Sequence, residues 1–222
     1  IYGAHAVERR LRVAPASVRT VYLGKRASSR RRQIAALAGR HGIATREADE
    51  ATLRKHAGSE AHQGVAALVT PFEYADLRAL AATGRPLLVV DQMNDPQNLG
   101  ALIRTAVAAG FAGVVLPERG AAAVTAAVEK ASAGAVNDLA VCRVVNLARA
   151  LDDLAAAGYW RLALTPRGAA SLYEVQIPTP VALVLGGETG IRRLVLERCD
   201  LFVNLAATAS GVGFSQTHHS HM

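Results

Sequence analysis

Residues 87–116 read LLVVDQMNDPQNLGALIRTAVAAGFAGVVL, and this stretch decides the fold class of the chain. The continuous apolar runs at 87–90 and 113–116 predict two strands that are buried on both faces, as parallel strands are. Between them, residues 99–109 predict a helix that ends at Gly110. Strand, helix and strand in this order predict an α/β fold with a mostly parallel sheet.

The same alternation continues toward the C-terminus. We expect helices at 121–133 and 147–157, and strands at 141–145, 160–165 and 180–185. Ligands of such sheets bind beyond the carboxyl ends of the strands. A site is therefore expected after Val90, Leu116, Thr165 or Leu185.

Toward the N-terminus, the first 70 residues predict a smaller α/β unit. Its strands are expected at 19–23, 45–47 and 64–69, and its helices at 29–40 and 49–56. Residues 72–83 predict a short helical connector that ends before Gly84 and Pro86. The sequence thus predicts a first domain at 1–70, a linker at 71–84 and a second domain at 85–222.

Composition excludes several classes of protein. The chain has 222 residues, of which 51% are hydrophobic and 19% charged, so it can bury a core. No apolar run reaches the roughly 18–20 residues of a membrane span, and the first residues lack the layout of a signal peptide. A cytoplasmic protein without a membrane partner is therefore expected. Cys142 and Cys199 lack zinc-site spacing and are expected to be ordinary small hydrophobic residues.

The excess positive charge lies in the first third of the chain. Residues 1–70 hold 11 Arg and 2 Lys against 5 acidic residues, although the whole chain has a net charge of only +7. Guanidinium groups match phosphate oxygens, so this part is expected to bind nucleic acid. The alternative is a solvated face in an arginine-rich protein, since Arg outnumbers Lys by 22 to 3. The predicted RNA-binding residues are Lys25, Arg26, Arg30, Arg31 and Arg32.

Common catalytic motifs are missing from the sequence. It has no G-x-G-x-x-G loop, no G-x-x-x-x-G-K-[ST] loop and no G-x-S-x-G elbow. The histidines are scattered apart from a group at the extreme C-terminus, so no metal site is expected. Polar residues do follow two predicted strands, at 91–98 and 186–190. A purely structural interpretation makes Asp95 and Pro96 a helix start, Gly186-Gly187 a tight turn with positive φ, and Arg104 a surface residue.

Taken together, these two segments resemble a known enzyme family. D-x-x-x-D-P-x-N-x-G-x-x-x-R-T-A at 91–106 and L-G-G-E at 185–188 resemble the SpoU (TrmH) class of the SPOUT RNA methyltransferases. That class transfers a methyl group from S-adenosylmethionine to a ribose 2′-hydroxyl. Residues 2–7, 62–67 and 130–135 look like further family segments. The first two are similar to the subgroup that modifies a guanosine of large-subunit (23S) ribosomal RNA.

The resemblance implies an architecture and partners. It implies a small, ribosomal-protein-like RNA-binding domain followed by an α/β-knot methyltransferase domain with a deep C-terminal trefoil knot. It also implies a homodimer, S-adenosylmethionine as cofactor and 23S rRNA as substrate. A knot could not be expected from composition or periodicity, because knots are nearly absent from proteins.

The resemblance also implies roles for individual residues. Arg104 would activate the 2′-hydroxyl, and Asn98 and Glu188 would orient the nucleotide or the arginine. Because an arginine is a poor base at neutral pH, Arg104 could instead stabilise the developing alkoxide or orient a phosphate. The residues expected to line the cofactor site are Thr165, Gly168, Leu185, Gly186, Gly187, Leu205 and Phe214.

The family's third motif departs from its usual form here. In register, Leu205, Gly213, Phe214 and Ser215 take the Ile, Ser, Leu and Asn positions, and no closing helix follows. The chain is thus either a truncated or gapped version of a longer protein, or its cofactor pocket is impaired. Three alternatives stay open: a non-catalytic RNA-binding protein with a decayed site, the same chemistry on tRNA or another rRNA site, and an unrelated α/β enzyme acting on a small molecule.

Overall fold

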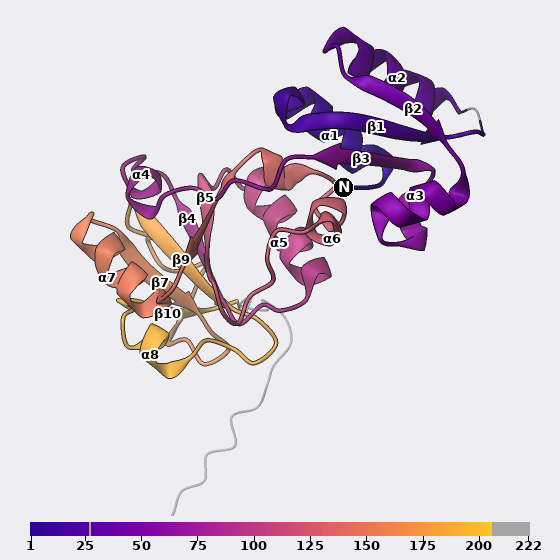
Figure 1. The fold of residues 1–222 in the computed structure, drawn as a ribbon. Helices are drawn as coiled ribbons and strands as arrows, with labels where there is room; N and C mark the ends of the chain where they lie inside the picture. The colour runs from indigo at the N-terminus through magenta and orange to yellow at the C-terminus, as the bar shows by residue number, and fades with distance from the viewer. Residues whose placement is uncertain (27, 206–222) are drawn as a thin grey trace, which may run out of the picture.

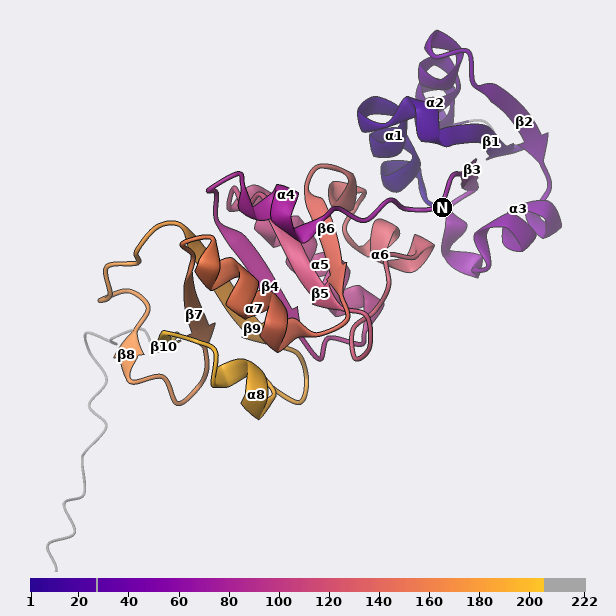
Figure 2. The same ribbon diagram turned by 60° about the vertical axis from the view of Figure 1, so that its left-hand side comes forward.

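The strands form two separate sheets in the computed structural model, which describes residues 1–26 and 28–205 (Figure 1). The first sheet has three strands in the order β2-β1-β3, and the second has seven in the order β6-β5-β4-β9-β7-β10-β8. Figure 2 shows the first sheet beyond α6 and the β6 edge of the second sheet, with β8 at the opposite end of the second sheet. We refer to the parts around these sheets as the first and second units.

The first unit is a small sheet with helices on both faces. Its strands are β1 (Val18–Gly24), β2 (Ala44–Ala48) and β3 (Val65–Val69), and its helices are α1 (Ala4–Val13), α2 (Ser29–Arg40) and α3 (Glu50–Ala57). Short 3-10 turns lie at Pro15–Ser17 and Glu60–His62. Strand β1 pairs in parallel with β2 and antiparallel with β3. The predicted strands and helices of this unit are confirmed, with small shifts at their ends.

Helix α1 was not predicted from the sequence. Its sequence, AHAVERRLRV, is rich in charge, and only Val7 and Leu11 form an apolar stripe one turn apart. Both side chains are fully buried against Val21 and Ile34. Tertiary burial of this narrow stripe therefore explains a helix that the overall polarity of the segment concealed.

The second unit is an all-parallel sheet. Its strands are β4 (Leu87–Asp91), β5 (Gly113–Pro117), β6 (Ala140–Val144), β7 (Trp160–Leu164), β8 (Ala170–Ser171), β9 (Val181–Gly186) and β10 (Leu201–Asn204). Every pairing between them is parallel. Its helices are α5 (Pro96–Ala108), α6 (Ala126–Ala131), α7 (Leu147–Ala156) and α8 (Arg193–Leu196), with a 3-10 turn at Ala135–Asn137. The predicted parallel α/β fold is thus confirmed.

Strand β4 shows why its apolar run is continuous. Leu87 and Val89 pack on one face of the sheet, in a core closed by α4 (Leu77–Ala81), α7 and α8. Leu88 and Val90 pack on the other face, in a core closed by α5 and α6. All five residues of β4 are buried. A strand covered on both faces in this way has no position at which a polar side chain could reach water.

Two predicted helices differ from those observed. Helix α5 begins at Pro96 rather than at 99, because the Asp95 side chain caps its N-terminus by accepting a hydrogen bond from the Gln97 amide. Helix α6 covers only Ala126–Ala131 of the predicted 121–133. The Ala122 amide instead donates to the Met93 carbonyl at 2.8 Å, and Ala133 and Gly134 have positive φ. Alanine propensity alone therefore overestimated this helix.

The predicted linker packs on the second unit over much of its length. Asp76 caps α4, and Leu80 and Ala81 are buried in the core of the second sheet. The Ala75 amide donates to the Val141 carbonyl at 2.8 Å. The predicted boundaries, with a first domain at 1–70, a linker at 71–84 and a second domain at 85–222, place the two sheets in different domains. We propose this division as the domain organisation of the chain.

Both cysteines lie in or against the core of the second unit. Cys142 is buried, and Cys199 is partly buried against the same core. Burial raises the pKa of each thiol to about 11, so both are protonated at neutral pH. This confirms their interpretation as small hydrophobic residues. Every helix formed by residues 1–26 and 28–205 is too short or too polar to span a lipid bilayer.

Candidate active site at the carboxyl ends of β4 and β9

The two motif segments leave neighbouring strands at the same edge of the sheet. Strands β4 and β9 are paired in register up to Asp91 and Gly186, so the loops that follow begin side by side. The Gly187 amide donates to the Asp91 carbonyl at 2.7 Å, and the Gly190 amide donates to the Gly187 carbonyl at 3.0 Å. The two motif segments therefore meet at the carboxyl ends of the strands, where a site was expected from the sequence.

An ion pair between the buried Asp91 and the half-exposed Arg192 connects the two loops. The Asp91 side chain is fully buried, and its carboxylate accepts hydrogen bonds from the backbone amide of Arg192 at 2.8 Å and from Nε at 2.9 Å. Nη2 of Arg192 lies 2.8 Å from the same carboxylate. Close by, the Thr189 hydroxyl donates to the Gln92 side-chain carbonyl at 2.8 Å. These contacts hold the second loop in one conformation over the first.

Asn98 and Glu188 meet across the two loops. Asn98 lies in the first turn of α5, and its Nδ2 donates to Oε1 of Glu188 at 2.8 Å. Hydrogen bonds to the carboxylate from the Glu188 backbone amide and then from Asn98 lower the pKa of Glu188. The group is thus ionised at neutral pH and is better suited to accepting hydrogen bonds than to taking up a proton.

Glycine is required at 186 and 187 by close approach of the backbone. A Cβ atom on Gly187 would lie 2.6 Å from the Gln92 carbonyl carbon, and one on Gly186 would lie 2.6 Å from the Gly190 Cα. Neither glycine has positive φ; in this turn it is Gly190 that does, at 82°. The structural interpretation of Gly186-Gly187 as a positive-φ turn is therefore wrong, because the need for glycine comes from space.

The remaining predicted cofactor residues lie at the ends of β7, β9 and β10. The Thr165 amide donates to the Val203 carbonyl at 2.9 Å, and the Gly168 amide donates to the Thr165 carbonyl at 3.1 Å. A Cβ atom on Gly168 would lie 2.6 Å from the Asn204 amide nitrogen. Leu185 is half-buried and Leu205 is 55% exposed. Phe214, with the rest of the third motif from residue 206 onward, lies outside the described residues, as does any knot closed there.

Arg104 does not join the contact between Asn98 and Glu188. It lies on α5, six residues after Asn98, which places it about 120° further round the helix. Its side chain is exposed and forms no hydrogen bond or ion pair with the described part of the chain. The guanidinium is therefore available to a ligand.

The predicted RNA-binding residues divide into two groups. Arg31 donates to the carbonyls of Gly24, Arg26 and Gln63, and Arg30 pairs with Glu8 and with Nδ1 of His5. These two side chains hold the first unit together. The other three, Lys25, Arg26 and Arg32, have exposed side chains.

One cluster in the first unit has the composition of a metal site. The ligand atoms of Glu50, Glu60 and His62 lie within 4.8 Å of one another. Glu60 is already paired with Arg54 at 2.9 Å, and Nε2 of His62 lies 3.1 Å from Glu50. Nδ1 of His62 accepts a hydrogen bond from the Gly64 amide. We therefore interpret the cluster as a network that shapes the turn before β3.

Sequence reasoning missed Arg192 as part of the site. Asp91 and Arg192 are 101 positions apart, and no motif connects them. The signal that could have found the pair is the position of Asp91, since an acidic residue at the end of an otherwise apolar buried strand needs a partner.

We expect the Arg192→Met variant to lose about 1–3 kcal/mol of unfolding free energy, because the buried Asp91 carboxylate loses the donors of the half-exposed arginine side chain and keeps the backbone amide of residue 192. Urea unfolding followed by circular dichroism measures this loss. The matched control is Arg193→Met at the neighbouring position, where the side chain is 85% exposed. It should stay within about 0.5 kcal/mol of the parent. Equal midpoints for the two variants would contradict the role of the ion pair.

Comparison with known proteins finds two families that together cover most of the chain. Residues 85–211 match the SpoU rRNA Methylase family, and residues 1–75 match the RNA 2′-O ribose methyltransferase substrate binding family. A 23S rRNA (guanosine-2′-O-)-methyltransferase RlmB from Burkholderia sp is 40% identical over 211 residues, which are 92% of this chain and 85% of that protein. The corresponding protein of Xanthomonas axonopodis pv. citri is 44% identical over 175 residues, covering 76% and 70%.

Other relatives and solved structures agree on the family and the fold. A Staphylococcus saprophyticus subsp. saprophyticus relative in the TrmH family of tRNA/rRNA methyltransferases is 40% identical over 151 residues, 65% of this chain. The chain spans only 61% of that relative's length. The crystal structure of the SpoU methyltransferase AviRb from Streptomyces viridochromogenes with its cofactor AdoMet superposes with a TM-score of 0.76. At 19% identity over 96% of this chain and 83% of that chain, this match concerns the fold alone.

Proposed function

The chain belongs to the SpoU family of RNA methylases, and from this premise we propose that it transfers a methyl group from S-adenosylmethionine to a ribose 2′-hydroxyl of RNA. The observation that carries the proposal is the hydrogen bond between Asn98 and Glu188. It unites polar residues of two sequence motifs 90 positions apart, at the edge of the sheet where ligands of parallel α/β folds bind.

The residues at this edge suit S-adenosylmethionine. A nucleoside cofactor needs backbone that it can approach closely and apolar side chains against which its base can lie. Gly186 and Gly187 provide a turn without side chains, and Leu185 and Leu205 provide apolar surface. Leu205 is 55% exposed, so its side chain is accessible to a ligand at this edge. We therefore propose that these residues, with Thr165 and Gly168, hold the cofactor; Phe214 stays a candidate from the family pattern.

Bound S-adenosylmethionine would supply an electrophilic methyl group on its sulfonium. A 2′-oxygen that bonded to this methyl carbon would displace the sulfur as S-adenosylhomocysteine and would release its hydroxyl proton to water. Because an arginine side chain is a poor base, the part of Arg104 is to stabilise the developing negative charge on the oxygen. The Asn98 amide, held by the Glu188 carboxylate, can orient the ribose with its remaining hydrogen-bonding groups.

We propose a guanosine of 23S rRNA as the target. Support comes from the relatives named as 23S rRNA enzymes, one of which the chain matches over 92% of its own length. The exposed Lys25, Arg26 and Arg32 of the first unit would bind RNA mainly through its phosphates. Relatives described as tRNA/rRNA methyltransferases make tRNA the second candidate. An enzyme with either target acts where ribosomes and tRNA are processed, so we propose a cytoplasmic location.

We also propose that the chain acts as a homodimer. Val145 is 83% exposed and Leu194 is 58% exposed, and both line a groove of about 390 Å³ beside the loop that carries Arg192. Two neighbouring exposed apolar side chains beside a groove support an interface at this place. Sedimentation of the full-length protein should then give twice the mass of one chain.

The function is tested by transfer of labelled methyl to three RNA pools. We expect label on a 2′-O-methylguanosine from deproteinised large-subunit rRNA, with little on tRNA or in reactions without RNA. Label on tRNA instead would favour the second candidate. RNA binding without transfer to either pool, also with assembled ribosomal particles, would identify a non-catalytic binding protein and refute the proposal.

A further inference from the structure

Helix α1 presents a buried arginine to the second unit. The Arg10 residue is only 5% exposed, and its Nε donates to the Ser17 hydroxyl at 2.7 Å. Its Nη1 hydrogen-bonds Oδ1 of Asn137 and lies 3.6 Å from Oε1 of Glu129. Asn137 Nδ2 in turn donates to Glu129 at 2.9 Å. Arg10, Glu129 and Asn137, which we call the joint, therefore form one network across the two units.

The joint is enclosed rather than a surface contact. Glu129 is 3% exposed, so its charge and that of Arg10 are both withdrawn from water. Burying charges is costly unless they are paired and hydrogen-bonded, and a network of this kind fixes direction as well as distance. An apolar interface would tolerate sliding, whereas the joint favours a single orientation of α1 against the second unit.

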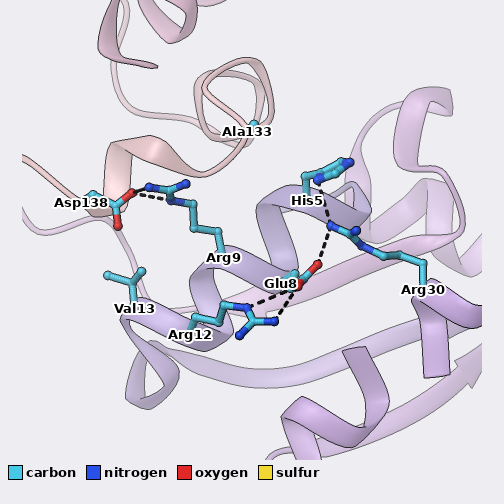
Figure 3. Close-up of a pocket in the computed structure, with 8 residues that line it drawn as sticks. All are labelled: His5, Glu8, Arg9, Arg12, Val13, Arg30, Ala133 and Asp138. Atoms are coloured by element: carbon cyan, nitrogen blue, oxygen red, sulfur yellow. Dashed lines mark hydrogen bonds and ion pairs between the residues drawn. The ribbon is translucent and has the colours of Figure 1, made fainter. Parts of the chain in front are cut away.

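Neighbouring contacts reinforce the same orientation. Arg9, one residue before Arg10, pairs with Asp138, and this pair reaches from α1 to the second unit (Figure 3). Lys130 donates to the Ala61 carbonyl at 2.6 Å. The backbone comes so close that a Cβ atom on Gly134 would lie 2.7 Å from the Cβ of Arg9.

The joint is connected by direct packing to the helix of the first motif. Glu129 belongs to α6, and α6 packs tightly on α5. A Cβ atom on Gly100 would lie 2.8 Å from the Ser132 amide nitrogen. Gly100 is only two residues from Asn98 on α5. The first unit is thus braced against the same helix that carries Asn98 and Arg104.

A cavity beside the joint leaves room for movement if the joint is broken. It measures about 480 Å³ and lies between α1 with its following turn, the start of the predicted linker and the 3-10 turn of the second unit. Arg10, Phe72 and Asn137 are among the residues that line it. Without the joint, the first unit could rotate about the linker into this space.

We propose that Arg10 is a positioning residue: through Glu129 and Asn137 it holds the RNA-binding unit at one angle to the strand-end site, so that RNA bound by the first unit presents its ribose to Asn98 and Arg104. The inference rests on the proposed function. Its energetic basis is that correct placement of a bound substrate contributes far more to rate than to binding.

The test compares Arg10→Met and Asn137→Ala with the parent protein. The two substitutions break the joint from opposite sides, so a folding defect confined to one unit would not affect both. We expect kcat/KM for methyl transfer to fall roughly 10- to 100-fold in each. RNA affinity should change less than about threefold, because phosphate contacts by other residues provide it. Small-angle X-ray scattering should show a larger radius of gyration, since the first unit is released.

Two controls separate positioning from general stability. Arg12→Met removes an arginine of the same helix whose side chain is 63% exposed, and it should leave rate and scattering unchanged. Arg10→Lys keeps the cation and should recover part of the lost rate. If Arg10→Met lowers the melting temperature but leaves kcat/KM and scattering within twofold of the parent, the joint is merely structural and the proposal is overturned. A parent protein that methylates no RNA refutes the proposed function instead, and scattering still tests the joint.

Discussion

Replacing Arg104 with alanine is expected to lower kcat for methyl transfer about 100- to 1000-fold, the usual cost of removing one group that stabilises charge in a transition state. The fold should be unaffected, because the Arg104 side chain is exposed and has no partner in the described part of the chain. Affinity for S-adenosylhomocysteine should also persist. Steady-state kinetics at saturating RNA, with calorimetric titration of that product, measure both.

Two further variants sharpen the result. Arg149→Ala removes an exposed arginine from α7, on the opposite face of the same sheet, and should leave kcat unchanged. Arg104→Lys keeps the positive charge but loses the planar fork, so partial activity would assign the role to charge alone. Near-normal turnover of Arg104→Ala at saturating RNA would show that another group performs the step.

Substituting Gly187 with alanine should have a comparably large effect by a different route. The added Cβ would lie 2.6 Å from the Gln92 carbonyl carbon and 2.8 Å from the Met93 Cα, so one loop must move. Movement breaks the 2.7 Å hydrogen bond from the Gly187 amide to Asp91 and misplaces Glu188. Because a displacement of about 1 Å can cost 100-fold in rate, we expect kcat/KM to fall about 100-fold and S-adenosylhomocysteine binding to weaken at least tenfold.

The control for this substitution is Gly39→Ala. Gly39 lies inside α2, and a Cβ atom there meets no atom within 4 Å. Alanine should therefore leave methyl transfer unchanged and stabilise the helix by about 0.5–1 kcal/mol. Calorimetry and circular dichroism on both variants separate a damaged site from a damaged fold. Unchanged cofactor binding in Gly187→Ala would mean that the turn does not form part of the cofactor site.

The sequence predicted best where one physical pattern dominated. The run at 87–90 is typical of a strand covered on both faces, and the structure covers it with α4, α7 and α8 on one side and α5 and α6 on the other. The purely structural interpretation recognised Asp95 and Pro96 as a helix start, and α5 begins there, three residues before the helix predicted from 99. Local signals of this kind do not depend on the rest of the chain.

Prediction failed where distant parts of the chain decide the outcome. Strands β8 and β10 have only two and four residues, and they exist because the sheet edge provides hydrogen-bonding partners. The pairing of Asp91 with Arg192, and of Arg10 with Asn137, joins residues more than 100 positions apart. No spacing rule reports such contacts. Charge counting likewise could not distinguish the internally bound Arg31 from the exposed Arg32.

The order of strands in the second sheet determines when the site can come into existence. Strand β9 lies between β4 and β7, both of which precede it in the chain. During synthesis, β4 and α5 are therefore made long before the glycine turn that completes their site. Closing this gap requires a long loop, which makes it a late step of folding. After the site has formed, a ligand that contacts both loops would shift the folding equilibrium toward the complete sheet. A partly synthesised chain would thus contain Asn98 but lack the glycine turn that is needed to complete the binding site.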